Sequence, residues 1–241
     1  MFALMCVASF FGSLVAGTMG LGGGVMLMAI MAMVFPPAVL IPLHGVVQLG
    51  SNLGRTVVTL RHVIREIVPA FVVGAVLGAV IGANMVVTLP TAWLQLILAL
   101  FVVYAMWGPR FRVGTPSKPT FFGVGLLGSF ATMFVGTIGP LLAPFVAAAS
   151  TDRQQVVATQ AGLMTMLHGF KIVAFGVLGF AFATYAGLLA GMLVFGFLGT
   201  LAGSRLLLRM PEKAFRIAFR VLLTLLAVRL GWGAASKLIA G

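Results

Sequence analysis

Long apolar runs separated by short basic patches are the feature that most restricts how this chain can fold. Only 7% of its 241 residues are charged and 61% are hydrophobic, whereas a soluble domain carries about a quarter charged residues. The runs are far longer than the ~10-residue alternating strands of an outer-membrane barrel. With a mean hydropathy of +1.20, the sequence predicts an all-α integral membrane protein with several spanning helices.

Residues that interrupt the apolar sequence divide it into eight segments: 2–35, 38–60, 66–88, 91–108, 120–149, 153–180, 183–207 and 213–238. The first and fifth contain helix-breaking residues near their middle, at Gly17–Gly24 and Gly136–Pro140. As one helix, the first segment would be about 50 Å long, against a hydrocarbon core of about 30 Å. We therefore expect each of these two segments to be a broken helical hairpin, with arms of about 14 residues.

The order of the segments repeats along the chain, since a broken segment is followed by three unbroken ones in each half. The tetrapeptide Gly17-Thr18-Met19-Gly20 also matches Gly136-Thr137-Ile138-Gly139. We predict an internal duplication with an N-terminal repeat at 1–112 and a C-terminal repeat at 113–241. Each repeat would consist of a hairpin and three transmembrane helices.

The distribution of Lys and Arg decides between two topologies. If each broken segment crossed the membrane once, eleven cations at the segment ends would divide five against six between the two sides. If each is a re-entrant hairpin, all eleven lie on one side, as the positive-inside rule requires. Each half then crosses three times, so the repeats are inverted and both termini are periplasmic. Two full crossings per broken segment give the same parity, but the arms are short for spans.

Several other classes of protein do not fit the sequence. The net charge of +12 could suit nucleic acid, but the cations gather at helix ends and we expect no nucleic-acid partner. The single cysteine, Cys6, excludes an internal disulfide and a CxxC metal site. A GxSG serine motif, an HExxH motif and an intramembrane carboxylate are all absent. We therefore expect neither an enzyme nor a bound cofactor or metal.

Two segments carry polar side chains at helical spacing inside a span, where ionisable groups are rare and commonly functional. The candidates are His44, Gln48, Asn52 and Arg55 in the first half, and Gln160, His168 and Lys171 in the second. A constant offset of 116 pairs His44 with Gln160, Asn52 with His168, and Arg55 with Lys171. Because no acidic residue lies within a span, these polar faces favour an oxyanion bound by basic side chains and neutral donors.

The hairpin tips are expected to line the same cavity, because irregular backbone at membrane depth is tolerated only where protein or water covers it. Free N–H groups at helix starts would suit an anion. The candidates are Thr18, Gly20, Gly22, Gly23, Gly24, Thr137 and Gly139. Other interpretations stay open. The glycines could permit close helix packing, and Arg55 and Lys171 could snorkel to the membrane surface. Asn52 and His168 could serve solely to form hydrogen bonds between helices.

At these residues the chain resembles the sulfite exporter TauE/SafE family, also called the toluene-sulfonate uptake permeases. The resemblance lies in Gly17-x-x-Gly-x-Gly-Gly-Gly24, its degenerate copy at Gly136–Pro140, and the two four-segment halves, and covers essentially the whole chain. It implies a secondary transporter that exports a sulfur-containing oxyanion, such as sulfite or an organosulfonate, across the bacterial inner membrane. The second copy lacks the glycine run and reads Pro140-Leu-Leu-Ala143, so equal contributions from both hairpins are in doubt.

Two alternatives to secondary transport remain at this point. A passive anion channel would share the same polar lining, and only flux against a gradient separates it from a carrier. A membrane assembly protein without transport activity would leave the cost of Arg55 and Lys171 inside a span unexplained. In each case the partners are the lipid bilayer and, for the two transport functions, a small anion.

Overall fold

A computed structural model of the chain describes residues 1–19, 22–86, 88–109, 113–206 and 212–240. All regular secondary structure in these residues is helical. Five helical stretches among them are long and apolar enough to cross a membrane: Arg65–Val86, Lys118–Val135, Arg153–Val177, Phe182–Gly203 and Arg220–Ile239. The predicted class, an all-α multi-pass membrane protein, is confirmed.

The helices follow the predicted segments to within four residues. The first half contains α1 (Phe2–Met19), α2 (Gly23–Met31), α3 (Pro37–Thr59), η1 (Leu60–His62), η2 (Arg65–Ile67), α4 (Val68–Val86) and α5 (Thr91–Trp107). The second half contains α6 (Lys118–Val135), α7 (Gly139–Ala149), α8 (Arg153–Val177), η3 (Phe182–Tyr185), α9 (Ala186–Leu206) and α10 (Glu212–Ala240). Each predicted broken segment is thus a pair of helices, α1–α2 and α6–α7.

The helix starts of the two halves are related by one constant spacing. α1 and α6 begin at residues 2 and 118, α2 and α7 at 23 and 139, and α3 and α8 at 37 and 153, so each pair is 116 apart. This is the offset that relates the predicted polar residues. The matched tetrapeptides do not follow it: Gly17–Met19 lie within α1, whereas 136–138 link α6 to α7. Thr18 and Thr137 are therefore not structurally equivalent.

The hairpin arms are unequal, which differs from the expected arms of about 14 residues. α1 and α6 have 18 residues each, whereas α2 has 9 and α7 has 11. At 1.5 Å per residue the long arms measure about 27 Å and the short arms about 14–17 Å. In the first hairpin the helix continues through Gly17, because a glycine lowers helix stability without ending the helix.

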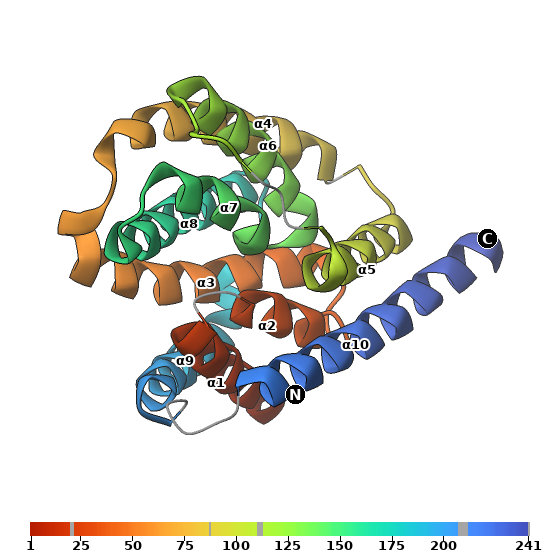
Figure 1. Cartoon of the computed structure of the whole chain (residues 1–241). Helices are drawn as coiled ribbons and strands as arrows, with labels where there is room; N and C mark the ends of the chain where they lie inside the picture. The colour runs from red at the N-terminus through yellow and green to blue at the C-terminus, as the bar shows by residue number, and fades with distance from the viewer. Residues whose placement is uncertain (20–21, 87, 110–112, 207–211, 241) are drawn as a thin grey trace.

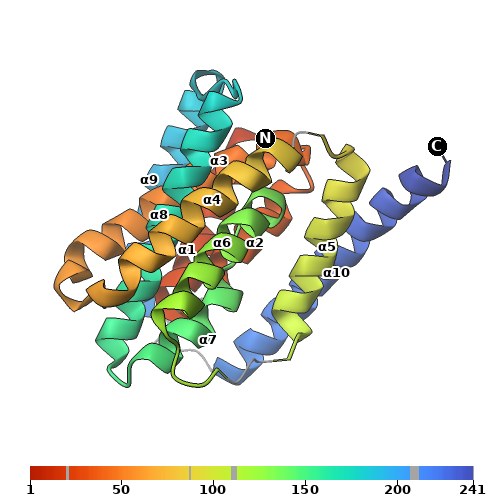
Figure 2. The same cartoon turned by 90° about the horizontal axis from the view of Figure 1, so that it is seen from above.

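The main helix pairs are symmetric with respect to the predicted duplication. α1 packs on α9, α4 on α6, α3 on α8, and α5 on α10, and Figures 1 and 2 show the last pair side by side at one edge of the molecule. Exchanging the two halves turns the first pair into the second and leaves the other two unchanged. Gly45 lies beside Lys171, and Thr56 Oγ1 lies 3.0 Å from Thr165 Oγ1, so α3 and α8 are antiparallel. Opposed directions of equivalent helices are what inverted repeats require.

Close backbone contacts hold α1 against α9 and α4 against α6. A Cβ added to Gly74 would lie 2.1 Å from the carbonyl oxygen of Phe122, and one added to Gly199 would lie 2.1 Å from that of Phe10. Small residues commonly permit such an approach between membrane helices. α9 also contacts α3, and α4 also contacts α8. The two glycine-lined pairs therefore support the central pair α3–α8, which carries the predicted polar faces.

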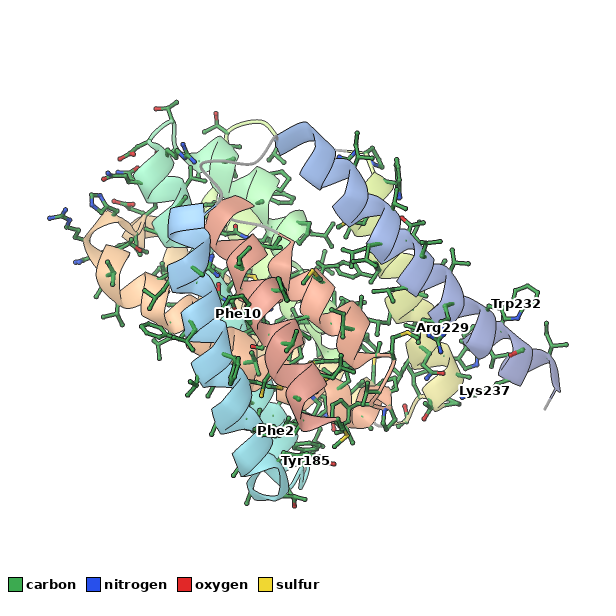
Figure 3. The ribbon with its side chains drawn as sticks, turned by 90° about the horizontal axis from the view of Figure 1, so that it is seen from below. Phe2, Phe10, Tyr185, Arg229, Trp232 and Lys237 are labelled. Carbon is green, nitrogen blue, oxygen red and sulfur yellow. The ribbon has the colours of Figure 1, made fainter. Side chains whose placement is uncertain are left out.

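The ends of several helices lie together at the two ends of the bundle. In Figure 3, Phe2 and Tyr185 lie toward the same end of the bundle as Lys237. The backbone N–H of Ile64 donates to Thr159 Oγ1, which places the basic turn after α3 near the start of α8. The sidedness in a membrane and the division at 1–112 and 113–241 stay predictions.

Candidate functional site

The polar faces of α3 and α8 meet where these two helices pack in the middle of the bundle (Figure 2). His44, Gln48 and Asn52 of α3 are buried, as are His168 and Lys171 of α8. The rings of His44 and His168 lie with centroids 6.0 Å apart, one edge toward the other face. The fold thus buries five of the predicted binding residues at one helix interface.

Lys171 is completely buried. Its alkyl chain crosses Gly45 of α3, where an added Cβ would lie 3.1 Å from Lys171 Cδ. Its ammonium donates a hydrogen bond to the carbonyl oxygen of Gly136. Lys171 therefore points into the bundle, which excludes the alternative that it snorkels to the membrane surface.

Gly136, which accepts that hydrogen bond, ends α6 at the break of the second hairpin. Its φ is 73°, a conformation that glycine adopts without the penalty of a side chain. An added Cβ would lie 2.6 Å from Met28 Sδ and 3.5 Å from His44 Nδ1. The break therefore lies against the polar residues, and the neighbouring Thr137 is buried with it. Gly136 was not among the predicted binding residues, although it lies in the predicted tip.

His44 is fixed by the first hairpin. Its Nε2 lies 2.9 Å from the carbonyl oxygen of Gly24, in the first turn of α2. Since a carbonyl only accepts, Nε2 carries the proton in this arrangement. The amide of Gln48 lies 3.3 Å from the same nitrogen, and Asn52 Nδ2 donates to the carbonyl of Gln48 at 2.8 Å. Because Nε2 of His44 and the amide nitrogen of Gln48 then both carry hydrogens, the 3.3 Å contact is not a hydrogen bond in this tautomer. The bonds along this face of α3 therefore join His44 to Gly24 and Asn52 to Gln48.

Arg55 continues this chain of hydrogen bonds at the far end of α3. Its Nη2 donates to Asn52 Oδ1 at 3.0 Å, and its Nε donates to the carbonyl of Ser51 at 3.3 Å. The guanidinium is thus turned back along the helix, away from the end at Thr59. Lys171 lies beside Gly45, ten residues earlier on α3 and about 15 Å away along its axis. Arg55 and Lys171 therefore do not converge on one small ion in this structure.

The polar face of α8 is less completely bonded. Gln160 Nε2 donates to the carbonyl of Gly139 at 3.1 Å, in the first turn of α7, as His44 does to Gly24 in the other half. However, Gln160 Oε1 and both ring nitrogens of His168 are buried without a hydrogen-bond partner among the described residues, as is Nδ1 of His44 on α3. An unsatisfied buried polar group costs about 1–3 kcal/mol, so such groups call for a ligand or an ordered water.

The first hairpin tip provides both backbone shape and close packing. Gly22 precedes α2 with φ 99°, and a Cβ added to Gly23 would lie 1.9 Å from the carbonyl oxygen of Gly12. Gly23 is therefore the point where the backbones of α1 and α2 touch, as the packing interpretation proposed. Gly20 and the side chain of Thr18 lie outside the described residues.

A narrow pocket lies between α1, α2 and α3. It is open to solvent and has room for about one water molecule. Its polar lining comes from Ser13, Gln48 and Ser51. Gln48 links it to His44, and a Cβ added to Gly24 would lie 2.4 Å from Gln48 Nε2. Ser13 was missed from the sequence. The sequence pattern that could have identified it is a set of small residues on one face of α1, namely Ser9, Gly12, Ser13 and Ala16.

We refer to His44, His168 and Lys171, together with the Gly24 and Gly136 carbonyls, as the inner cluster. No carboxylate accompanies it: Glu66 and Asp152 are exposed, and Glu212 is the first residue of α10. Among the described residues, no three His, Cys, Asp or Glu side chains lie together as metal ligands. The inner cluster is thus a buried, purely basic group with unused hydrogen-bonding capacity, which suits a small anion.

Comparison with known proteins gives one match. A family model described as sulfite exporter TauE/SafE matches residues 5–230. No curated protein and no solved structure matches the chain.

Proposed function

We propose, since the chain belongs to the sulfite exporter TauE/SafE family, that it is a secondary transporter of a small sulfur-containing oxyanion, sulfite or an organosulfonate. Transport would run outward across the bacterial inner membrane, with both termini on the periplasmic side. The chain is a multi-pass membrane protein, and its family consists of transporters rather than enzymes.

The observation that carries the proposal is the surroundings of Lys171. This side chain is completely buried, and within the described residues its ammonium has one hydrogen-bond partner, a backbone carbonyl. The ring of His168, which has no partner among the same residues, lies one helical turn away. An isolated buried charge is strongly unfavourable unless an opposite charge accompanies it. A sulfur oxyanion supplies one negative charge or two and several acceptor oxygens, which match the ammonium and a ring N–H.

The remaining predicted residues have distinct roles in this proposal. Gln48 and Ser51 line the pocket between the first hairpin and α3, and Arg55 adds a partly exposed cation further along the same helix face. They would form a route by which the anion approaches the inner cluster. His44 and Gln160 would keep the short hairpin arms in place through their bonds to Gly24 and Gly139.

A passive channel is the second candidate. Its pore would have to pass continuously through the bundle, whereas His44, His168 and Lys171 are each completely shielded from solvent. A shielded site favours a carrier that opens to one side at a time. If the chain were an assembly protein without transport activity, the energetic cost of burying Lys171 without a counter-charge would be unexplained.

Exchange measurements in proteoliposomes test the proposal. Vesicles loaded with unlabelled sulfite should accumulate labelled sulfite transiently above its outside concentration, because a carrier exchanges one substrate for another and a channel does not. Lys171→Gln should abolish this exchange. Lys118→Gln is the matched control, since Lys118 is an exposed lysine at the start of α6. Wild-type vesicles that neither exchange nor release sulfite or methanesulfonate would contradict the proposed function.

A further inference from the structure

The inner cluster contains a positive side chain but no built-in counter-charge. α8 makes its main contacts with α3, α4, α6, α7 and η1. All titratable groups on these elements and on α8 itself are basic: His44, Arg55, Arg61, His62, Lys118, Arg153 and His168. Asp152 caps the start of α8, nineteen residues from Lys171 and about 28 Å away along the axis.

Only two of these groups face Lys171. His44 lies across the helix interface beside Gly136, and His168 lies one turn before Lys171 on α8. Arg55 lies about 15 Å along α3, and the others stand at helix ends or in η1. Among the described residues, the ammonium form of Lys171 therefore has one carbonyl dipole for compensation and two further basic groups nearby.

Burial makes the charge of Lys171 and the presence of an anion depend on each other. Taking a lone ammonium out of water costs several kcal/mol, and so does burying a lone anion. When both are present, their attraction in a poorly polarisable interior offsets much of both penalties. Thermodynamic linkage then requires that the anion favours the protonated amine as strongly as the protonated amine favours the anion.

We propose that each anion enters the inner cluster together with one proton, which is carried on Lys171, so that proton and anion are co-substrates of one transport step. The inference rests on the proposed function, because it assigns the coupling ion to the same site. Lysine suits this role since its amine changes charge when buried, whereas arginine keeps its charge.

The step involves only the transfer of a proton. The lone pair of the neutral Lys171 amine accepts a proton from the aqueous side to which the site is open, giving the ammonium, and no bond in the anion changes. Release returns the anion and the proton to the opposite side. A sulfonate with one negative charge then crosses as a neutral pair. Fully deprotonated sulfite crosses with one net negative charge, which an inside-negative potential drives outward.

Calorimetry on the purified protein tests the proposal with two probes, methanesulfonate and sulfite, at a pH where both are fully deprotonated. Binding is measured in two buffers with different ionisation enthalpies, and the difference gives the number of protons taken up. We expect about one proton per anion in the wild type and none in Lys171→Arg, whose charge is fixed. His168→Gln should keep the proton uptake, since it leaves the amine in place.

The pH dependence provides a second measurement that needs no variant. If binding requires a proton, the affinity of the wild type for methanesulfonate should fall as pH rises, by up to about tenfold per pH unit. Binding without proton uptake and with a flat pH profile would overturn the coupling and leave the proposed function standing. Proton uptake that persists in Lys171→Arg would overturn the assignment to Lys171. If neither probe binds to the wild type, the proposed function itself fails.

Discussion

The polar face of α3 and the polar face of α8 occupy equivalent places in the two halves, but their hydrogen bonding differs. On α3, Arg55 donates to Asn52, Asn52 to the Gln48 carbonyl, and His44 to Gly24. On α8, in the part of the chain that the structure describes, neither nitrogen of His168 has a partner, and Lys171 donates to one backbone carbonyl. The two faces, which the predicted duplication makes equivalent, thus differ in degree: among the described residues only Nδ1 of His44 is buried without a partner on the α3 face, whereas on α8 both nitrogens of His168 and Oε1 of Gln160 are.

The two cations differ as well. Lys171 crosses the helix interface and reaches Gly136 at the break of its own half's hairpin. Arg55, its counterpart at the offset of 116, bonds instead to side-chain and backbone atoms of the preceding turn of α3. In the proposed transporter, the second half would provide the charge at the centre of the site, and the first half would provide the pocket beside it.

The largest expected effect tests whether the two halves have opposite orientations in the membrane, and its outcome is all-or-none. In a Cys6-free background, a cysteine at Gly114 should be inaccessible to impermeant reagent in intact cells, because the segment before α6 is predicted to be cytoplasmic. An added Cβ at Gly114 meets nothing within 4 Å, so folding should be unaffected. Ser236→Cys, at an exposed position near the end of α10, is the control and should be labelled from outside. Labelling of position 114 from outside would break the comparison.

The next largest expected effect is a difference in anion affinity between variants of Lys171 and of Arg55. Lys171→Gln should weaken anion binding by about 10- to 150-fold, because a charge-assisted contact in a buried site contributes roughly 1.5–3 kcal/mol. Arg55→Gln should weaken it by less than about tenfold, since a partly exposed cation interacts through a higher effective dielectric. Affinities of purified protein, normalised to the folded fraction, provide the measurement. Equal losses in both variants would show that the two halves contribute charge equally.

The break of the second hairpin should be sensitive to a side chain at Gly136. Gly136→Ala places a Cβ on a residue with φ 73°, which costs about 1–2 kcal/mol in the left-handed region. Gly123→Ala, in α6 where an added Cβ meets nothing within 4 Å, should be neutral or slightly stabilising because alanine favours helix. Thermal unfolding in detergent compares the two. A transition temperature for Gly136→Ala equal to that of Gly123→Ala would mean that the break tolerates a side chain.

The smallest effect compares the two histidines. His44→Leu removes the bond to Gly24 and should destabilise the fold by about 1 kcal/mol. His168→Leu removes a ring with no partner in the described structure, so the fold should lose little stability while anion affinity falls about fivefold, as for one hydrogen bond. Unfolding and binding measured on the same preparations distinguish the outcomes. Loss of stability without loss of binding in His168→Leu would make it a structural residue.

Much of the fold could be predicted from local sequence. Apolar length and glycine-rich breaks located every helix to within four residues, since a span must cover the hydrocarbon core and its ends carry polar groups. The spacing of 116 between polar residues also predicted which helices are equivalent. The tetrapeptides Gly17–Gly20 and Gly136–Gly139 align the two halves with a spacing of 119 instead of 116. Such a short match is a poor guide to equivalent positions in a chain where glycine is frequent.

Other properties depended on contacts between distant segments. The sequence by itself placed Arg55 and Lys171 on the polar faces of two predicted spanning segments, because hydropathy and helical spacing are local properties. Only the tertiary structure decided that Lys171 is completely buried and meets Gly136, 35 residues away, whereas Arg55 folds back on its own helix. It also decided that Gly23 serves close packing and that His168 has no partner. Burial and hydrogen-bond satisfaction depend on which helix faces meet, and that is set by the packing of α3 against α8.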